Sequence, residues 1–396
     1  MDESNPTPPI GERVRAARRA TGMNIGTLAG LIGKSKGWMS MVENGHIALD
    51  KRSDIAAIAD VLQVSADTLL GEPADDIPAR LPSVNLVALR EVLHEYAVDD
   101  PPDVPVRPLE QTAADLARLD DQLRRTDYES MMRTLPRVLS ELHAGAHLAE
   151  PHRSEALRQL ITACGLAVIV MRHFGHSDLA WISGDRSRQA AAELGDPVWS
   201  AAAAYQRAHA RSSANRSRAL LATPRVADEL EPHIGDDPFA HQVHGMLRLS
   251  AALANQVSGN HNEAQRQAAE AADLAARFEE PDDPQAWELF GVSNVGVWRT
   301  MLAVEAGDAG EAMRISDQVD TSALASKNRK AALAMDRFRA LHQLGRDKLA
   351  GRELQKAEKL SPAQVRYSPM VREAVRDMAA VKDPVLRGVA WRMGVI

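Results

Sequence analysis

Apolar residues recur along the first 71 positions at the spacing of short amphipathic helices. Ile10, Val14 and Ala17 follow the i, i+4, i+7 pattern that places side chains on one helix face. Four more short helices are expected after this one, the last two at about 53–62 and 65–70. Helices this short depend on packing against one another for their stability. The pattern therefore predicts a small, all-helical unit at the start of the chain.

A tight glycine turn joins the second and third of these helices. Asn24 and Ser35 stand at the N-cap positions of the segments IGTLAGLI and KGWMSMVEN, and Gly33 supplies the turn between them. In the third helix Met39 and Val42 are expected to face inward. The outer face of this helix then carries Lys36, Gly37, Ser40 and Met41. Two helices around a short glycine turn, the second with a basic and polar outer face, describe a helix-turn-helix.

Charge separates this unit from the rest of the chain. Residues 10–52 contain eight lysines and arginines against three acidic residues, whereas the whole chain of 396 residues has a formal net charge of −7. Such asymmetry indicates that the basic unit meets a polyanion and that the acidic remainder does not.

The run from residue 11 to residue 49 resembles the Cro/C1-type (XRE-like) DNA-binding domain, which is a five-helix, lambda-repressor-like helix-turn-helix. The residues at family spacing are Leu28, Ala29, Gly33, Ser35, Ser40, Glu43, Asn44 and Gly45. The resemblance implies that Lys36, Gly37 and Met41 read base edges. It places Trp38 and Ser40 beside the DNA backbone. Ser35 also belongs to the expected DNA-binding residues.

One position departs from the family pattern. Ile25 stands where the family usually has a glutamine that grips a phosphate. Phosphate contacts would then be made by Asn24, Lys34, Lys51 and Arg52. One recognition helix reads few bases, and each good contact discriminates by about 1–3 kcal/mol. We therefore expect a homodimer on a roughly palindromic double-stranded DNA operator.

Prolines separate the basic unit from the long remainder. Between the proline clusters, Leu86, Leu89 and Leu93 are spaced for one amphipathic helix. Proline favours extended backbone, so this stretch is expected to be a semi-rigid spacer with one helix. The expected domains are residues 1–72, 73–115 and 116–396.

The third domain is alanine-rich and is expected to be helical throughout. A turn pattern recurs in it: a glycine or small residue, two to four polar residues, and an alanine that opens a new helix. The copies are RTDYES (125–130, weaker), GHSDLA (175–180), ANRSRA (214–219), GNHNEA (259–264), GDAGEA (307–312) and GRDKLA (345–350). They resemble the inter-helix turn of tetratricopeptide repeats, at spacings longer than the standard ~34 residues. The resemblance implies an α-solenoid with a concave groove.

In tetratricopeptide domains the first helix of each pair lines the groove. Counting back from each turn places these residues there: Arg172, Tyr205, Arg211, Gln256, Asn294, Trp298 and Arg339. The segment WELFGVSNVGVWR adds Trp287 and Phe290. An aromatic wall with a few polar groups suits a small molecule or a short peptide. The competing interpretation is that the aromatic residues fill the core between repeats and that the arginines are solvated or ion-paired.

The whole architecture resembles the actinobacterial group of XRE regulators with a tetratricopeptide-like C-terminal domain. FGVSNVGVW, RKAALAMDRFRALHQLGRDKLA and WRMG are the segments that carry this resemblance. Related receptors bind short signalling peptides in the groove. Val292 and Ser293 replace the group's usual Pro-Thr, so the resemblance leaves the ligand open.

No pattern for catalysis or metal binding occurs in the sequence. His143 and His147 are four residues apart, but two histidines in an alanine-rich stretch are ordinarily surface residues. The single cysteine, Cys164, lies in the apolar segment TACGLAVIV and is expected to be an inert packing residue. We therefore expect no enzymatic activity, no cofactor and no metal site.

The start of the sequence, MDESNPTPPIGER, lacks the basic start and apolar segment of a signal peptide. The longest apolar run, Leu166 to Met171, is far shorter than the ~20 residues needed to cross a bilayer. These observations predict a cytoplasmic protein with no membrane partner. Its function is expected to be ligand-responsive transcription regulation. The alternatives are a DNA-anchored adaptor whose solenoid is a constitutive protein-interaction scaffold, and an antitoxin-like repressor, which the length disfavours.

Overall fold

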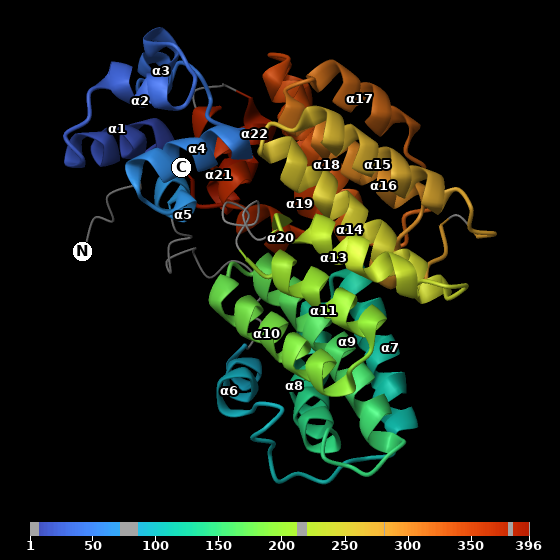
Figure 1. Cartoon of the computed structure of the whole chain (residues 1–396). Coiled ribbons are helices and arrows are strands. Elements are labelled where there is room, and N and C mark those ends of the chain that lie inside the picture. Colours follow the sequence, from blue (N-terminus) through green and yellow to red (C-terminus); the bar gives the residue numbers. More distant parts are fainter. Residues whose placement is uncertain (1–7, 72–85, 212–219, 281, 379–382, 396) are drawn as a thin grey trace.

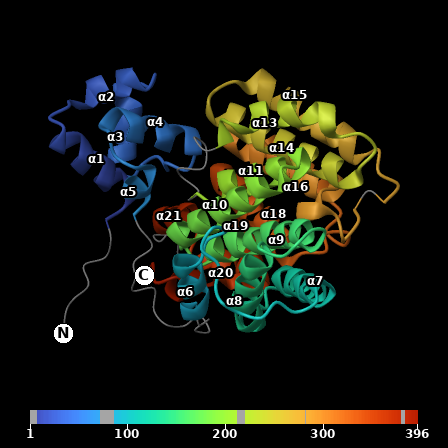
Figure 2. The same cartoon turned by 60° about the horizontal axis from the view of Figure 1, so that its bottom comes forward.

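The computed structural model describes residues 8–71, 86–211, 220–280, 282–378 and 383–395. Every regular element in these ranges is a helix, so the expected all-α fold class is confirmed. Figures 1 and 2 show a small helical unit beside a much larger one. We call residues 8–71 the head and residues 86–395 the body.

The head consists of five helices around one core, as the sequence predicts. Asn24 Oδ1 accepts a hydrogen bond from the Thr27 N–H at 2.9 Å, and Ser35 Oγ accepts one from the Trp38 N–H at 3.1 Å, so both predicted N-caps form. Gly45 (φ 70°) stops the third helix in the left-handed region, which glycine adopts without a Cβ clash. The helices are α1 (Ile10–Ala20), α2 (Ile25–Leu31), α3 (Lys36–Glu43), α4 (Arg52–Leu62) and α5 (Ala66–Leu70). The core includes Val14, Leu28, Met39, Val42, Ile58 and Leu69.

The helix predicted within the proline-rich segment is present as α6 (Val87–Glu95). Its Leu89 and Leu93 are fully buried, and the helix packs on α8 and α10 of the body. It is therefore part of the body's core and not an isolated spacer helix. The first long body helix begins at Leu109, inside the segment predicted as linker. Residues 72–85 lie outside the described ranges, so the domain boundaries stay predictions.

Antiparallel helix pairs make up most of the body. The pairs are α7 (Leu109–Arg125) with α8 (Tyr128–Gly145), α9 (His152–His173) with α10 (Ser177–Leu194), α11 (Pro197–His209) with α13 (Thr223–Leu230), α14 (Pro238–Val257) with α15 (His261–Ala275), α16 (Val292–Ala306) with α17 (Ala309–Gln318), and α18 (Lys327–Gln343) with α19 (Asp347–Leu360). Two single turns of 3₁₀ helix, η1 (Glu231–His233) and η2 (Trp287–Leu289), precede α14 and α16.

Five of the six predicted turn motifs join the two helices of a pair. The glycine of each strong copy is left-handed, with φ between 68° and 83°, and Thr126 takes that conformation in the weaker copy. A left-handed residue after the last helical turn stops one helix and lets the chain reverse into the next. The sixth motif, ANRSRA, lies outside the described residues. The arrangement of successive pairs is consistent with the expected solenoid.

The solenoid closes on itself, which the sequence did not predict. The first helices of the pairs pack in chain order, and α18 of the last pair returns to contact α7 of the first. Asn328 of α18 joins the two ends. Its side-chain N–H donates to the Leu123 carbonyl at 2.9 Å, and its Oδ1 accepts from the hydroxyls of Tyr128 and Ser361, each at 2.9 Å. The expected open groove is therefore the interior of a ring of helices.

Three short helices close the chain and carry the head. They are α20 (Pro362–Arg366), α21 (Pro369–Asp377) and α22 (Pro384–Arg392). In Figure 1 they are red and lie between the head and the ring, and α21 contacts α5. Met370 of α21 is part of the head's hydrophobic core. The head is thus packed on the body through apolar as well as polar contacts.

Among the described helices, α9 is long and apolar enough to cross a membrane by length and composition. Of its most apolar window, however, 72% is buried inside the protein. Its apolar residues pack in the core that α9 forms with α7, α8 and α10. An apolar helix buried on nearly all sides is what the centre of a large helical core requires.

Candidate DNA-binding face and ligand cavity

The outer face of α3 is accessible in the folded chain. Lys36, Gly37 and Met41 are exposed, Met41 to 45%, while Met39 and Val42 point into the head's core. Trp38 and Ser40 are half-buried beside them. The structure therefore places the residues predicted to read bases together on one surface.

A buried carboxylate fixes α3 against α1. Glu43 accepts hydrogen bonds from Arg18 Nε at 2.6 Å and Arg18 Nη2 at 2.9 Å, and Arg15 lies 3.6 Å away. Gly11 packs directly on the last turn of α3, since a Cβ there would lie 2.2 Å from the Val42 carbonyl oxygen. The Glu43 that marks the family signature thus has a structural role, which is to hold the orientation of the predicted recognition helix.

The four predicted phosphate anchors have different surroundings. Asn24 caps α2 with its side chain. Lys34 Nζ lies 2.9 Å from the Asp54 carboxylate and 4.9 Å from the centre of the Trp38 ring. Lys51 Nζ donates to the carbonyl of Ala306 in the body at 3.5 Å. Lys34 stays on the outer side of the helix-turn-helix, whereas Lys51 faces the body.

Arg52 requires the clearest correction. Its backbone N–H donates to Glu305 at 3.0 Å, and its guanidinium forms a hydrogen-bonded ion pair with the same carboxylate. Glu305 belongs to α16 and is almost fully buried. An arginine committed to a buried carboxylate is not available to a DNA phosphate in this conformation. The sequence does not reveal that the start of α4 is covered by the body.

Two body carboxylates cap the starts of two head helices. Glu305 receives the N–H of Arg52 at the start of α4, and Glu373 receives the N–H of Ile10 at the start of α1, both at 3.0 Å. Glu373 also pairs with Arg13 at 2.8 Å. A carboxylate at a helix N-terminus is stabilised by the free N–H groups and the helix dipole. These contacts fix how the head is oriented on the body.

A cavity of about 1080 Å³ lies inside the ring. Residues of α7, α9, α11, α14, α16 and α18 line it, which agrees with the expectation that the first helix of each pair faces the concave side. The head contributes to the wall as well, through Arg52, Asp67 and Gly71. The cavity therefore reaches from the interior of the ring to the contact between head and body.

Five of the nine predicted ligand residues line this cavity: Arg172, Tyr205, Arg211, Trp287 and Trp298. The aromatic ones also contact one another. The ring centres of Tyr205 and Trp287 lie 5.0 Å apart, and those of His209 and Trp298 lie 5.9 Å apart. Arg211 lies at the periphery, 4.6 Å from the centre of the Trp181 ring.

The other four predicted residues do not line the cavity. Phe290 fills the core beside Gly245 and Phe278, and Gln256 is buried in α14. Arg339 pairs with Glu305 at 2.9 Å and donates to the Asp50 carbonyl of the head at 2.7 Å. For Phe290 the competing core interpretation is thus the correct one. Counting back from a turn identified which face of a helix points into the ring. It could not show that the head covers part of that face.

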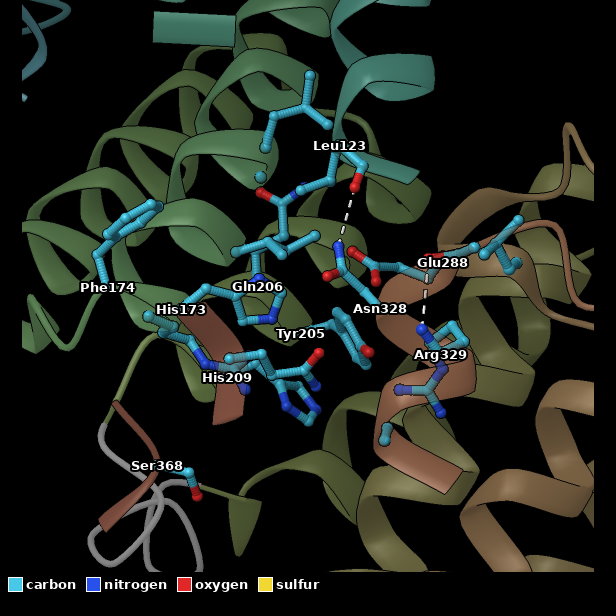
Figure 3. A pocket seen from close by; sticks show the side chains of 18 of the residues that line it. Leu123, His173, Phe174, Tyr205, Gln206, His209, Glu288, Asn328, Arg329 and Ser368 are labelled. Carbon is cyan, nitrogen blue, oxygen red and sulfur yellow. Dashed lines mark hydrogen bonds between the residues drawn. The ribbon is translucent and has the colours of Figure 1, made fainter. Parts of the chain in front are cut away.

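Asn294, the fourth of these residues, does not line the cavity but forms hydrogen bonds with two residues that do. Its side-chain N–H donates to the Glu288 carbonyl at 3.0 Å, and its Oδ1 accepts from Arg329 Nε at 2.7 Å. It therefore positions two residues that do line the cavity and that sequence reasoning missed. Figure 3 shows Tyr205, Glu288 and Arg329 reaching the same space from three different elements.

Glu288 is held in an unusual conformation. Glu288 (φ 51°) and Leu289 (φ 56°) are consecutive non-glycine residues in the left-handed region. Such strain persists only where surrounding contacts enforce it, and it clusters at functional sites. Burial raises the pKa of Glu288 to about 7, although the positive charges of Arg329 and Arg172 act in the opposite direction. The left-handed pair left no signal in the sequence, since neither residue is a glycine.

The histidines and the cysteine that the sequence analysis considered lie outside the cavity. His143 Nδ1 contacts the Leu139 carbonyl at 2.7 Å, and His147 Nε2 contacts the Val98 carbonyl at 2.7 Å, so the two imidazoles serve different backbone groups. Burial raises the pKa of the Cys164 thiol to about 12. Within the described ranges, no group of three or more histidine, cysteine or acidic side chains could hold a metal ion.

Comparison with known proteins identifies the class of the head. Residues 9–70 match the family model described as a helix-turn-helix domain. The match covers all five head helices and supports a DNA-binding regulator of the XRE type. No curated protein and no solved structure matches the chain. The comparisons therefore assign a class to the head alone.

Proposed function

We propose that this chain is a sequence-specific transcription regulator whose body binds a small molecule or a short peptide and transmits its presence to the head. The helix-turn-helix match and the exposed outer face of α3 support DNA binding. The observation that carries the sensing role is the shared wall of the cavity. Arg52 and Asp67 of the head line it together with residues of the six body helices named above, so an occupant would contact both units.

The coupling follows from the same contacts. Arg52 is held by Glu305, and Glu305 is also paired with Arg339 of α18. Arg339 lies 3.7 Å from Asp336, which lines the cavity. A ligand shifts DNA binding only through its different affinity for two arrangements of the head, typically by 1–3 kcal/mol. We infer that ligand binding strengthens or weakens the head–body contact and so changes the orientation in which α3 is presented.

The DNA half of the proposal is tested by selecting bound sequences from random double-stranded DNA, using the wild type and Lys36→Ala. We expect a defined site for the wild type and a roughly 5–150-fold weaker affinity for Lys36→Ala, the effect of losing one base contact. Lys348→Ala, a change of an exposed lysine on α19, is the matched control and should bind as the wild type does. Equal affinity for all sequences would support the DNA-anchored adaptor instead.

We also propose that the regulator binds its operator as a homodimer, because one head reads few base pairs. Light scattering on the free chain and on its DNA complex measures the mass directly. A two-to-one complex of chain and duplex is the expected result. A one-to-one complex on the selected site would refute the dimer and leave the monomeric regulator.

A further inference from the structure

We propose that the cavity's ligand is a small aromatic carboxylate, whose acid group is held by Arg172 and Arg329 and whose ring packs on Tyr205, Trp287 and Trp298. This inference rests on the proposed function and deepens it, since it names the chemistry of the molecule that would occupy the cavity.

The first argument is the unpaired positive charge inside the cavity. Arg172 and Arg329 both line the cavity. The positive charge of Arg329 adds to burial in lowering the pKa of Arg172, and Glu288 acts on both guanidinium groups in the opposite direction. Neither guanidinium forms an ion pair with any residue of the described ranges. Of the four other arginines that line the cavity, Arg52 pairs with Glu305 and Arg124 with Asp120. Glu288 acts on both cations and Asp336 on Arg329, but neither carboxylate is in ion-pair contact with them. A buried cation without such a contact is costly, so an anion would relieve the cost at this place.

The second argument is the supply of hydrogen-bond donors. Arg172 Nε and Trp298 Nε1 are buried and have no hydrogen-bond partner among the residues that the structure describes. Both are groups that can donate but not accept. An ionised carboxylate accepts with two oxygens and donates nothing, and an arginine fork matches its geometry. A neutral ligand can accept from one of these N–H groups through a carbonyl oxygen, but it brings no negative charge to the two guanidinium groups.

The third argument is the aromatic wall. Tyr205, Trp287 and Trp298 line the cavity, and the Arg329 guanidinium lies 5.9 Å from the centre of the Trp298 ring. Flat aromatic surfaces favour a planar partner in stacked or edge-to-face contact. The wall therefore selects an aromatic acid over a short aliphatic acid or inorganic phosphate.

The volume limits the size of the ligand but admits two sources. About 1080 Å³ accommodates a compact organic acid or a few residues of a peptide, whereas a nucleic acid duplex is excluded. A free aromatic acid and a short peptide ending in an aromatic residue share the same carboxylate. The experiment must therefore compare the two.

Calorimetric titration of the full chain tests the proposal with matched probes. The free acid is 2-naphthoate, and 2-naphthamide is its neutral counterpart. The peptide is Gly-Gly-Phe, with a free or an amidated C-terminus. We expect the wild type to bind at least one acid tenfold or more tightly than its amide. Arg172→Met and Arg329→Met should each weaken the acid at least tenfold and abolish the preference over the amide.

Two further variants separate charge from fold. Arg133→Met makes the same change on the exposed face of α8, where Arg133 pairs with Glu129, and should bind the acid as the wild type does. Arg172→Lys keeps the charge and should restore part of the preference for the acid. Equal binding of acid and amide, or no binding of either acid at millimolar concentration, overturns the proposal. Which of the two acids binds more tightly identifies the source.

The two proposals can fail separately. DNA selection with the wild type in the absence of acid tests the proposed function, and the titrations with acid and amide test the ligand. Acid binding without sequence-specific DNA binding would refute the regulator and leave the site standing. Sequence-specific DNA binding without any preference for the acid would refute the ligand proposal and leave the regulator standing.

Discussion

The head and the body use the same kind of side chain in opposite ways. On α3 of the head, Lys36 is exposed and stands among small or apolar neighbours on an accessible surface. In the body, Arg172 and Arg329 face the enclosed space of the ring, and burial lowers the pKa of both guanidinium groups. A cation on an open face can serve a large polyanion, whereas a desolvated cation in a cavity can serve only an anion small enough to enter.

The two regions also differ in how they are held together. The head's helices are short, capped by side chains, and share one core to which the body adds Met370. The body's helices are long and close into a ring through Asn328. Between them lie two buried carboxylates, Glu305 and Glu373. The difference indicates that the head is the less stable unit and that these carboxylates decide its orientation.

The largest expected effect tests the contact between the two regions. Glu305→Ala leaves Arg52 without its carboxylate and Arg339 with only Asp336, 3.7 Å away, and breaking a buried pair in this way costs about 3–5 kcal/mol. Urea unfolding followed by circular dichroism measures the loss. Glu311→Ala, which removes an exposed partner of Arg314 on α17, is the control and should leave the transition unchanged. If Glu305→Ala and Glu311→Ala unfolded at the same urea concentration, Glu305 would not be what holds the head on the body.

The second prediction asks whether the head unfolds separately. Leu28→Ala creates a cavity in the head's core and should destabilise it by about 2–5 kcal/mol, while the body's transition stays in place. DNA binding should be lost in the same variant. Leu160→Ala, at an equally buried position of α9, should shift the body's transition instead. A common shift of both transitions in either variant would show that the two regions unfold as one.

The third prediction uses the pKa of Glu288, which burial raises to about 7. Because the folded pKa lies above the ordinary value, ionised Glu288 opposes folding. The penalty is absent at low pH, grows as the pH rises toward 7, and is complete above it. Glu288→Gln should therefore raise the Tm at pH 8 by roughly 2–4 °C, about 1 kcal/mol, and change it little at pH 5.

Several charged groups surround Glu288, and the comparison with the variant isolates its contribution. Arg329 on α18, Arg172 on α9, and Asp120 with Arg124 on α7 all act on its carboxyl group. Asp336 also lines the cavity, and burial raises its pKa to about 6. These groups are present in both proteins, so their titration cancels. A Tm difference that does not depend on pH would contradict the prediction.

The smallest expected effect concerns a single helix cap. Ser35→Ala removes the acceptor for the Trp38 N–H at the start of α3 and should destabilise the head by about 1 kcal/mol. Because α3 carries the residues that we propose to contact DNA, operator affinity should fall as well. Ser65→Ala removes the equivalent cap of α5, where Ser65 Oγ accepts from the Thr68 N–H at 2.9 Å. Ser65→Ala should destabilise the head by a similar amount. Its affinity for the operator should fall only as far as the larger unfolded fraction requires.

Local features of this protein were predictable from the sequence, because they depend on neighbouring residues. The caps at Asn24 and Ser35, the left-handed Gly45, and the inward faces of Met39 and Val42 all follow from residues a few positions apart. The glycine turns of the body belong to the same class. Periodicity and turn chemistry therefore determined the all-α fold, the helix-turn-helix and the paired helices.

The tertiary structure decided what depends on distant residues. The return of α18 to α7 through Asn328 turned an expected open groove into a cavity inside a ring of helices. The docking of the head placed Arg52 and Arg339 in a buried contact with Glu305, where neither can serve the role expected of it. Glu288 and Arg329 became candidate ligand residues through backbone strain and proximity alone. No periodic pattern records such contacts, because each depends on where elements hundreds of residues apart meet and exclude water.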